Sequence, residues 1–226
     1  HWPEKHHGRH YGGALDHPEK VHAEIQRNLD AGFIEGPLHY VPHIVQSLGG
    51  VWKEDKAKWR TIVDATSSGV NPASEHLTAE YDMLSDVLAT LVPDAYMSGF
   101  DLTDAFCNWP YRPEHADLWG FKDAVTGNYY RYRFMAFGGR QSPAMQQHWA
   151  RVLKGIINEH GLRYVDPASP AASYDGFRCA GAFVDDFHLQ HPPTLSQSQA
   201  QEQFDSTVLQ LLTYLGLEVL KDTLIL

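Results

Sequence analysis

The sequence has few cysteines, no long apolar run and little positive charge, and each shortage narrows what the protein can be. The two cysteines among its 226 residues, Cys107 and Cys179, are far apart, which argues against a disulfide framework and fits a reducing compartment. No apolar run approaches the roughly 18 residues that cross a bilayer, and no secretory leader is visible. We therefore expect an intracellular protein, of the cytoplasm or nucleus, with no membrane partner.

Lysine and arginine together number 18, against 28 aspartate and glutamate residues, which gives a net charge of -10. Domains that bind nucleic acid usually present a basic face to the phosphates, so this balance counts against that class. Basic residues nevertheless gather locally, within residues 53–60 and again within 131–151. The charge therefore weakens a nucleic-acid function without excluding it.

Apolar residues make up 43% of the chain, enough to bury a sizeable core in one or two lobes. Apolar residues at three-and-four spacing predict helices over about 18–31, from Pro143 onward and over 196–215. Short strands alternate with these helices, so the expected fold class is α+β. In the second helix, the apolar face expected to pack on a sheet consists of Met145, Trp149, Val152, Leu153, Ile156 and Ile157.

One short segment, Phe183-Val184-Asp185-Asp186, carries two adjacent carboxylates between apolar stretches. The pattern predicts a strand, a tight turn and a second strand. An Asp-Asp pair alone more often just marks a turn, because aspartate is a common turn former. The apolar flanks and a remote acidic partner favour a hairpin that holds a divalent metal.

The remote partner is Asp101-Leu102-Thr103-Asp104, at the end of another apolar stretch. Joining a 3′-hydroxyl to a nucleoside triphosphate requires two Mg²⁺ ions roughly 3.5–4 Å apart. Mg²⁺ is usually held by one or two carboxylates plus substrate phosphates. Asp101, Asp185 and Asp186 are therefore candidates for the catalytic residues and metal ligands, with two Mg²⁺ as cofactor and Mn²⁺ as a substitute.

A basic hairpin and a glycine pair are candidates for binding the triphosphate and the base. Lys53 and Arg60 are seven residues apart, which predicts one side of a hairpin, and both cations suit phosphate oxygens. The alternative is a solvated charged hairpin. Gly138 and Gly139 have no Cβ and would let the backbone approach a bound base or sugar.

In this order the segments resemble the fingers and palm of a reverse transcriptase from a retroelement, of the LTR or DIRS-like retrotransposon or pararetrovirus type. The resemblance covers nearly all of residues 17–226. The order of five segments is more specific than any one of them. They are Lys53–Asp64, Gly99–Phe106, Tyr130–Gly139 with Ser142–Ala144, Phe183–Asp186 and Leu215–Val219.

The resemblance implies an RNA-directed DNA polymerase, a nucleotidyltransferase that takes deoxynucleotides and a primed RNA or DNA template. It implies Leu102 as a metal ligand beside the three aspartates, and Phe106 as a gate that excludes a 2′-hydroxyl. The nucleotide-binding residues that it implies are Lys53, Arg60, Asp104, Ala105, Phe106, Phe137, Gly138 and Gly139.

The resemblance also implies a right-hand polymerase fold without a thumb, whose palm is a ferredoxin-like antiparallel sheet backed by helices. Fingers are expected over 16–94 and 111–140, and palm over 95–110 and over 141–226, truncated at its C-terminal end. Residues 1–15, rich in His and Gly, are expected to form a flexible arm. The chain looks like a fragment of a polyprotein whose thumb and RNase H segments would be partners.

Two functions compete on these observations. The first is the polymerase, which the intact carboxylates favour. The second is a reverse-transcriptase-like fold retained as a non-catalytic scaffold, or assembled into an oligomer, particle or filament, which the acidic charge and the absent thumb favour. A metal-dependent phosphohydrolase is more remote, because nothing beyond the same acids would activate water.

Overall fold

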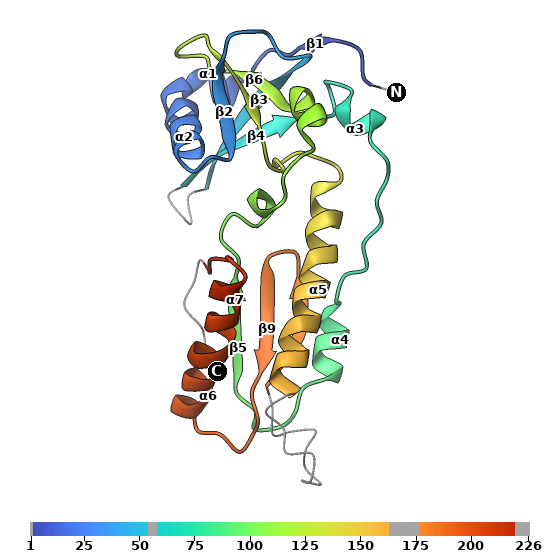
Figure 1. Ribbon diagram of the computed structural model, residues 1–226, viewed down its shortest axis with the longest axis vertical. Helices are drawn as coiled ribbons and strands as arrows, with labels where there is room; N and C mark the ends of the chain where they lie inside the picture. Colours follow the sequence, from blue (N-terminus) through green and yellow to red (C-terminus); the bar gives the residue numbers. More distant parts are fainter. Residues whose placement is uncertain (1, 54–57, 163–176, 220–226) are drawn as a thin grey trace. The chain divides into compact units, whose positions relative to one another are not determined.

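The computed structural model describes residues 2–53, 58–162 and 177–219, which form two compact units (Figure 1). Unit 1 comprises His1–Leu77 and Phe106–Pro143, and unit 2 comprises Thr78–Ala105 and Ala144–Leu226. Residues 78–94, within the predicted fingers, fall in unit 2, and residues 106–110, within the predicted palm, fall in unit 1.

The described residues form both helices and strands, which agrees with the α+β class. The strands are β1 (His6–His7), β2 (Ile34–Leu38), β3 (Ile44–Lys53), β4 (Lys58–Asp64), β5 (Met97–Asp101), β6 (Gly120–Lys122), β7 (Tyr129–Tyr132), β8 (Arg178–Phe183) and β9 (Asp186–Gln190). The α-helices are α1 (Gly12–Asp16), α2 (Pro18–Asp30), α3 (Val70–Ala73), α4 (Leu84–Ala89), α5 (Ser142–Leu162), α6 (Gln197–Gln203) and α7 (Gln210–Tyr214). Short 3₁₀ helices η2 (Ala105–Asn108) and η3 (Pro113–Trp119) and a π-helical stretch η5 (Phe204–Leu209) complete the list. No helix within the described ranges is long and apolar enough to cross a membrane.

Unit 1 is built on a mixed sheet in the order β1-β3-β6-β7-β2, with β4 paired to β3. The predicted helix over 18–31 is confirmed as α2, which buries Val21 and Ile25 against this sheet's core. Pro18 occupies its first turn, where a missing N–H costs nothing. Gly32, with φ +74°, ends it in the left-handed conformation that glycine adopts without strain.

The N-terminal residues differ from the flexible arm that their His and Gly content predicts. His6–His7 pair as β1, parallel to β3, and α1 follows. His10 is held at both ring nitrogens: Nδ1 accepts from the Leu48 N–H at 3.0 Å, and Nε2 donates to the Lys122 carbonyl at 2.7 Å. Tertiary hydrogen bonds therefore order a segment that composition alone would leave mobile.

Unit 2 is built on an antiparallel sheet in the order β5-β9-β8. Phe100 of β5 and Phe187 of β9 are stacked, with ring centroids 4.7 Å apart, and both are buried. They belong to one core with residues of α5, η5 and α7, so these helices cover one face of the sheet. The other core members are Leu102, Ala105, Ala150, Leu153, Ile157, Phe177, Cys179, Ala182, Leu189, Phe204, Val208 and Leu212.

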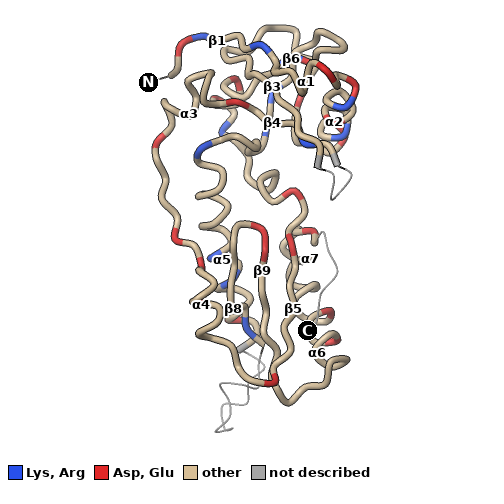
Figure 2. Tube along the Cα trace, turned by 180° about the vertical axis from the view of Figure 1, so that it is seen from behind, with Lys and Arg blue, Asp and Glu red and all other residues tan. Residues whose placement is uncertain are grey.

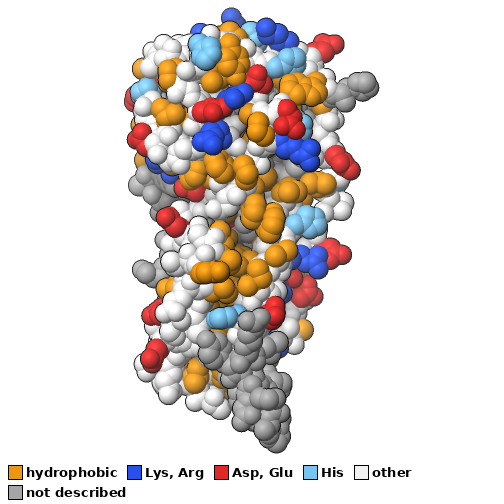
Figure 3. Space-filling model, in the orientation of Figure 1, with side chains coloured by type: hydrophobic (Ala, Val, Ile, Leu, Met, Phe, Trp, Pro, Cys, Tyr) orange, Lys and Arg blue, Asp and Glu red, His pale blue; other side chains and the backbone are white. Residues whose placement is uncertain are grey.

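The buried face of α5 differs from the predicted one. Leu153 and Ile157 are buried as expected, but Trp149, Val152 and Ile156 are 41%, 48% and 37% exposed. Figure 3 shows hydrophobic side chains gathered over α5. The buried face also carries two glutamines, Gln146 and Gln147, at 1% and 0% exposure. The apolar pattern predicted the wrong buried face because α5 packs beside the edge of β8. The backbone groups of that edge need polar side chains as hydrogen-bond partners.

Candidate active site

Strands β5 and β9 bring two of the predicted carboxylates together. Asp101 and Asp186 are directly opposite each other in the antiparallel ladder, so they share a sheet face with Cβ atoms about 4.5–5.5 Å apart. Asp185 precedes Asp186 in the hairpin turn, and its carbonyl accepts a hydrogen bond from the Leu102 N–H at 3.0 Å. Figure 2 shows acidic positions at the tip of the β8–β9 hairpin.

The exposure of these groups bears on metal binding. Asp186 is exposed, Asp101 and Asp185 are partly buried, and Oδ1 of Asp101 is inaccessible to solvent. Within the described ranges, no group of three or more His, Cys, Asp or Glu residues is arranged to hold a metal. Two carboxylates on one face nevertheless fit Mg²⁺, which takes its remaining ligands from water and phosphates. The Leu102 side chain is a hydrocarbon that lies in the core, and the residue's only possible metal ligand is its backbone oxygen.

The chain that follows Asp101 turns sharply within unit 2. Asp104 adopts a positive φ of 44°, and Ala105, which is buried, begins η2. Beside this turn runs the segment that resembles the fifth motif: the Thr103 N–H donates to the Glu218 carbonyl at 2.9 Å. The structure thus brings three of the five segments together at one end of the unit 2 sheet.

Three of the predicted nucleotide-binding residues form one cluster in unit 1. The Arg60 guanidinium lies over the Phe137 ring, 5.5 Å from its centroid. The Phe106 ring meets Phe137 edge-to-face, with centroids 4.8 Å apart. Phe137 is 49% exposed, so the cluster presents an aromatic surface with an attached cation.

The basic hairpin has the register that the spacing predicts. Val51 is opposite Arg60, and Lys53 is opposite Lys58. Positions 51 and 53 share one face of their strand, so positions 53 and 60 are on the same face of the ladder. The side chain of Lys53 lies outside the described part of the chain.

Gly138 is required by the packing of unit 1 itself. Its φ is +110°, and a Cβ there would lie 1.9 Å from the Val63 carbonyl of β4. Asn71 holds the same loop, donating to the Gly138 carbonyl at 2.9 Å and accepting from the Arg140 N–H at 2.8 Å. Gly138 was predicted to let the backbone approach a ligand, and in the structure it lets the backbone approach β4. Gly139 packs near Trp119 and Ser142.

Solved structures of similar fold include foamy virus protease-reverse transcriptases. The native protease-reverse transcriptase of prototype foamy virus matches 99% of this chain with a TM-score of 0.67 at 22% identity, over 26% of its own chain. A mutant of the same protein matches 97% with a TM-score of 0.66 at 23% identity, over 25% of its chain. A foamy viral protease-reverse transcriptase in complex with double-stranded DNA matches 97% with a TM-score of 0.71 at 19% identity, over 33% of its chain.

The chain has a reverse-transcriptase-like fold. It spans about a quarter to a third of the matched viral chains. No protein-family model matches the sequence, and no curated protein does. The likeness is therefore one of fold at low sequence identity.

In this reverse-transcriptase-like fold, the predicted site residues divide between the two units. Arg60, Phe106 and Phe137 are brought together within unit 1, and Asp101 and Asp186 are paired within unit 2. Unit 2 holds Asp101, Leu102, Asp104, Ala105, Asp185 and Asp186, and unit 1 holds Lys53, Arg60, Phe106, Phe137, Gly138 and Gly139.

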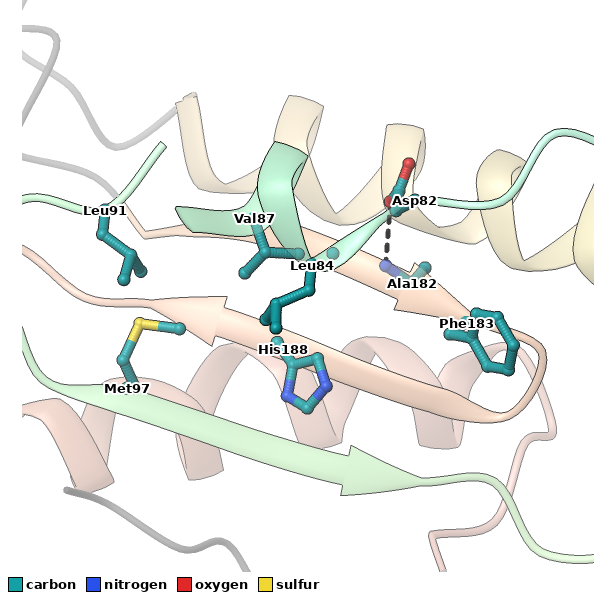
Figure 4. A pocket seen from close by; sticks show the side chains of 9 residues that line it. Asp82, Leu84, Val87, Leu91, Met97, Ala182, Phe183 and His188 are labelled. Carbon is teal, nitrogen blue, oxygen red and sulfur yellow. Dashed lines mark hydrogen bonds between the residues drawn. The ribbon is translucent and has the colours of Figure 1, made fainter. Parts of the chain in front are cut away.

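An apolar pocket of about 340 Å³ lies on the sheet face that carries Asp101 and Asp186 (Figure 4). Met97 of β5 and His188 of β9 line it at alternate positions from the two aspartates, and Leu84, Val87 and Leu91 line it from the α4 segment. Between the two aspartates at the hairpin end and Arg178, which pairs with Gln190 at the far end of the sheet, this pocket is lined largely by apolar side chains.

Asp82 fastens the α4 segment to β8 and was missed by the sequence analysis. Its Oδ2 accepts from the Ala182 N–H at 2.9 Å (Figure 4) and from the Lys154 ammonium at 2.6 Å. Burial raises the pKa of Asp82, but the bonds from Lys154 and Ala182 outweigh burial and hold the pKa below its usual range. A lone Asp in a polar loop carries no sequence signal for such a role.

Proposed function

We propose that this chain is the core of an RNA-directed DNA polymerase that adds deoxynucleotides to a primer by two-metal nucleotidyl transfer. The observation that supports the proposal most directly is the cross-strand pairing of Asp101 with Asp186, next to Asp185, at one end of a sheet. Two carboxylates paired across two strands, with a third in the adjoining turn, are more than a turn requires. They suit a cation that phosphates also bind.

In this proposal, Asp101, Asp185 and Asp186 hold the metal, with the Leu102 carbonyl as a further oxygen donor. Two Mg²⁺ ions, when bound, would activate the primer hydroxyl and stabilise charge on the triphosphate and leaving group. The protein's own part is to orient the carboxylates. Asp186 is fixed by strand pairing and Asp185 by the hydrogen bond from Leu102.

Unit 1 would supply the grip on the incoming nucleotide. Arg60, with Lys53 on the same face of the hairpin, would bind phosphate oxygens, since guanidinium forks match phosphate geometry. Phe137 would contact the new base pair with its exposed ring, and Phe106 would exclude a 2′-hydroxyl. Asp104, Ala105, Gly138 and Gly139 would line the nucleotide through their backbone.

The nucleic-acid partner in this proposal is a primed RNA or DNA template. A viral protein of similar fold is described in complex with double-stranded DNA. The matched viral chains are three to four times as long as the part that this chain covers. Thumb and RNase H segments would complete the polymerase, as part of the same proposal.

A scaffold without chemistry is the second candidate. Two observations favour it: no three-residue metal group is arranged within the described ranges, and the net charge is -10. An acidic surface opposes binding to phosphate backbones. In this alternative the fold would serve an assembly, and the carboxylates would be dispensable.

The two candidates are separated by Mg²⁺-dependent extension of a DNA primer on an RNA template. The wild type is compared with Asp185→Asn, and with Asp205→Asn as a control for the same change at an exposed aspartate of unit 2. Incorporation that vanishes only in Asp185→Asn supports the polymerase. If the folded wild type fails with both Mg²⁺ and Mn²⁺, the scaffold is the better account.

A further inference from the structure

None of the described strands pairs with the outer edge of β8, and side chains bond to that edge instead. β8 is the last strand of the order β5-β9-β8, so alternate N–H and C=O groups point away from β9. Side chains of α5 and of Asp82 bond to these groups. The pairs are Asn158 with Cys179, Lys154 with Ala180, Asp82 and Gln147 with Ala182, and Gln146 and Gln147 with Val184.

Gln147 binds the backbone on both sides of Phe183. Its Oε1 accepts from the Val184 N–H at 2.7 Å, and its Nε2 donates to the Ala182 carbonyl at 3.0 Å. The neighbouring Gln146 donates to the Val184 carbonyl at 3.0 Å. Both glutamines are almost fully buried, at 0% and 1% exposure. The two carboxamides therefore hold all three outward-facing backbone groups from the Ala182 carbonyl to the Val184 carbonyl.

The held segment is the one that leads into the metal-binding turn. Val184 has a φ of +58°, a left-handed conformation that β-branched residues rarely adopt. It stands immediately before Asp185. On the other side of the turn, the Asp185 carbonyl accepts a hydrogen bond from the Leu102 N–H. The direction in which the two aspartates leave the sheet thus depends on what keeps Val184 in place.

We infer that Gln147 is a positioning residue for Asp185 and Asp186, an inference that rests on the proposed metal site. Gln147 acts through the backbone and not by touching the metal or the nucleotide. Residues that orient metal ligands from behind usually change metal affinity about 10–100-fold when removed. Loss of Gln147 should therefore weaken metal binding beyond any loss of stability.

The same helix offers a matched control. Asn158 makes an equivalent two-sided bond to Cys179, accepting from its N–H at 2.6 Å and donating to its carbonyl at 3.4 Å. Cys179 lies at the start of β8, at the end of the strand away from the turn. Removing Asn158 breaks the same kind of edge bond without touching the residues that lead into Asp185.

The test compares Gln147→Met and Asn158→Leu in the 226-residue chain. Both variants should unfold at lower temperature, because each leaves buried backbone groups without partners. Mn²⁺ affinity, measured by electron paramagnetic resonance, should fall about tenfold or more in Gln147→Met only. Gln147→Glu keeps an acceptor for Val184 and loses the donor to Ala182, so it should bind Mn²⁺ with intermediate affinity. If Gln147→Met does not fold, Gln147→Glu takes its place in the comparison.

Equal Mn²⁺ affinity in Gln147→Met and Asn158→Leu would overturn the inference and leave Gln147 a structural residue only. A wild type without Asp185-dependent Mn²⁺ binding would overturn both the inference and the proposed metal site. A wild type that binds Mn²⁺ through Asp185 but extends no primer would contradict the polymerase alone. In that case the loss of affinity in Gln147→Met still decides the role of Gln147.

Discussion

The two units complete their sheets by different means and carry different chemistry. In unit 1, the N-terminal β1 adds a strand beside β3, so backbone pairs with backbone. In unit 2, the edge of β8 is paired with helix side chains, among them Gln147 and Asn158. The candidate residues of unit 1 are cationic and aromatic, and those of unit 2 include the carboxylates. Each unit has its own core, so a change in one can be measured against the other.

The greatest loss should follow removal of a carboxylate from unit 2. Asp101→Asn should lower primer extension on the order of 10³-fold, because it removes charge directly opposite Asp186. His188→Gln, two positions along the same face of β9, should leave extension within about threefold. Single-turnover rates at saturating Mg²⁺ measure both. Retained activity in Asp101→Asn would remove Asp101 from the metal site.

A core substitution in unit 2 should show which face of α5 packs. Leu153→Ala should lower the free energy of unfolding by about 2–5 kcal/mol, because Leu153 is 6% exposed within the core. Val152→Ala, one residue away and 48% exposed, should change it by less than about 0.5 kcal/mol. Urea unfolding of both variants provides the comparison. Equal losses of unfolding free energy in the two variants would show instead that α5 packs with the apolar face that the sequence pattern predicts.

In unit 1, the aromatic cluster should control the choice of sugar. Phe106→Val should increase incorporation of ribonucleotides relative to deoxynucleotides at least about tenfold, because it removes bulk from the proposed gate. The ratio of kcat/KM for the two nucleotides is the measurement. Phe134→Val, an aromatic of unit 1 that packs on Phe33, is the control and should leave the ratio unchanged. An unchanged ratio in Phe106→Val would make Phe106 a packing residue.

The smallest effect should be a difference in acid sensitivity between the units. Burial lowers the pKa of His191 in unit 2 below 6.5, although a hydrogen bond from its ring to Gln203 opposes this. Below pH 6.5 the unfolded state therefore binds more protons at His191 than the folded state does. The stability that neutral His191 contributes is full above pH 6.5 and is lost as the pH falls below 6.5. The loss cannot exceed about 1.4 kcal/mol per pH unit for one proton.

The Asp64 carboxylate of unit 1 should not respond to the same change of pH. Burial raises the pKa of Asp64, but hydrogen bonds from Tyr11, Ser67 and Thr66 lower it from 3.8 to about 2. That contribution is present above pH 3.8 and is lost only as pH falls toward 2. Hydrogen exchange at pH 7.5 and 5.5, corrected for intrinsic rates, should therefore show weaker protection at pH 5.5 in the part of unit 2 around His191, and no change that depends on Asp64. His191→Asn should remove most of the difference.

The local sequence was sufficient to predict the elements whose residue pattern lies within one short stretch of chain. The three-and-four spacing of Val21 and Ile25, between Pro18 and Gly32, determined α2. The apolar flanks of Asp185-Asp186 determined the β8–β9 hairpin. In both cases the neighbours along the chain create the preference, and tertiary contacts only reinforce it.

Tertiary structure decided the features that depend on partners remote in sequence. Trp149 and Val152 continue the apolar pattern of α5 but are exposed, while Gln146 and Gln147 are buried. The pattern reports hydrophobicity, whereas the face that meets β8 must supply donors and acceptors to an unpaired strand edge. The His-rich N-terminus is ordered for the same reason, through β3.

The sequence by itself therefore determined which residues are candidates for the chemistry: acids on two apolar strands, a basic hairpin and an aromatic-glycine loop. Only the tertiary structure decided that Asp101 faces Asp186, that Arg60 lies over Phe137, and that buried carboxamides hold the turn before Asp185. The reaction that a site can support depends on its residue types, which the sequence shows directly. Register and edge pairing follow from long-range hydrogen bonds, which no local pattern encodes.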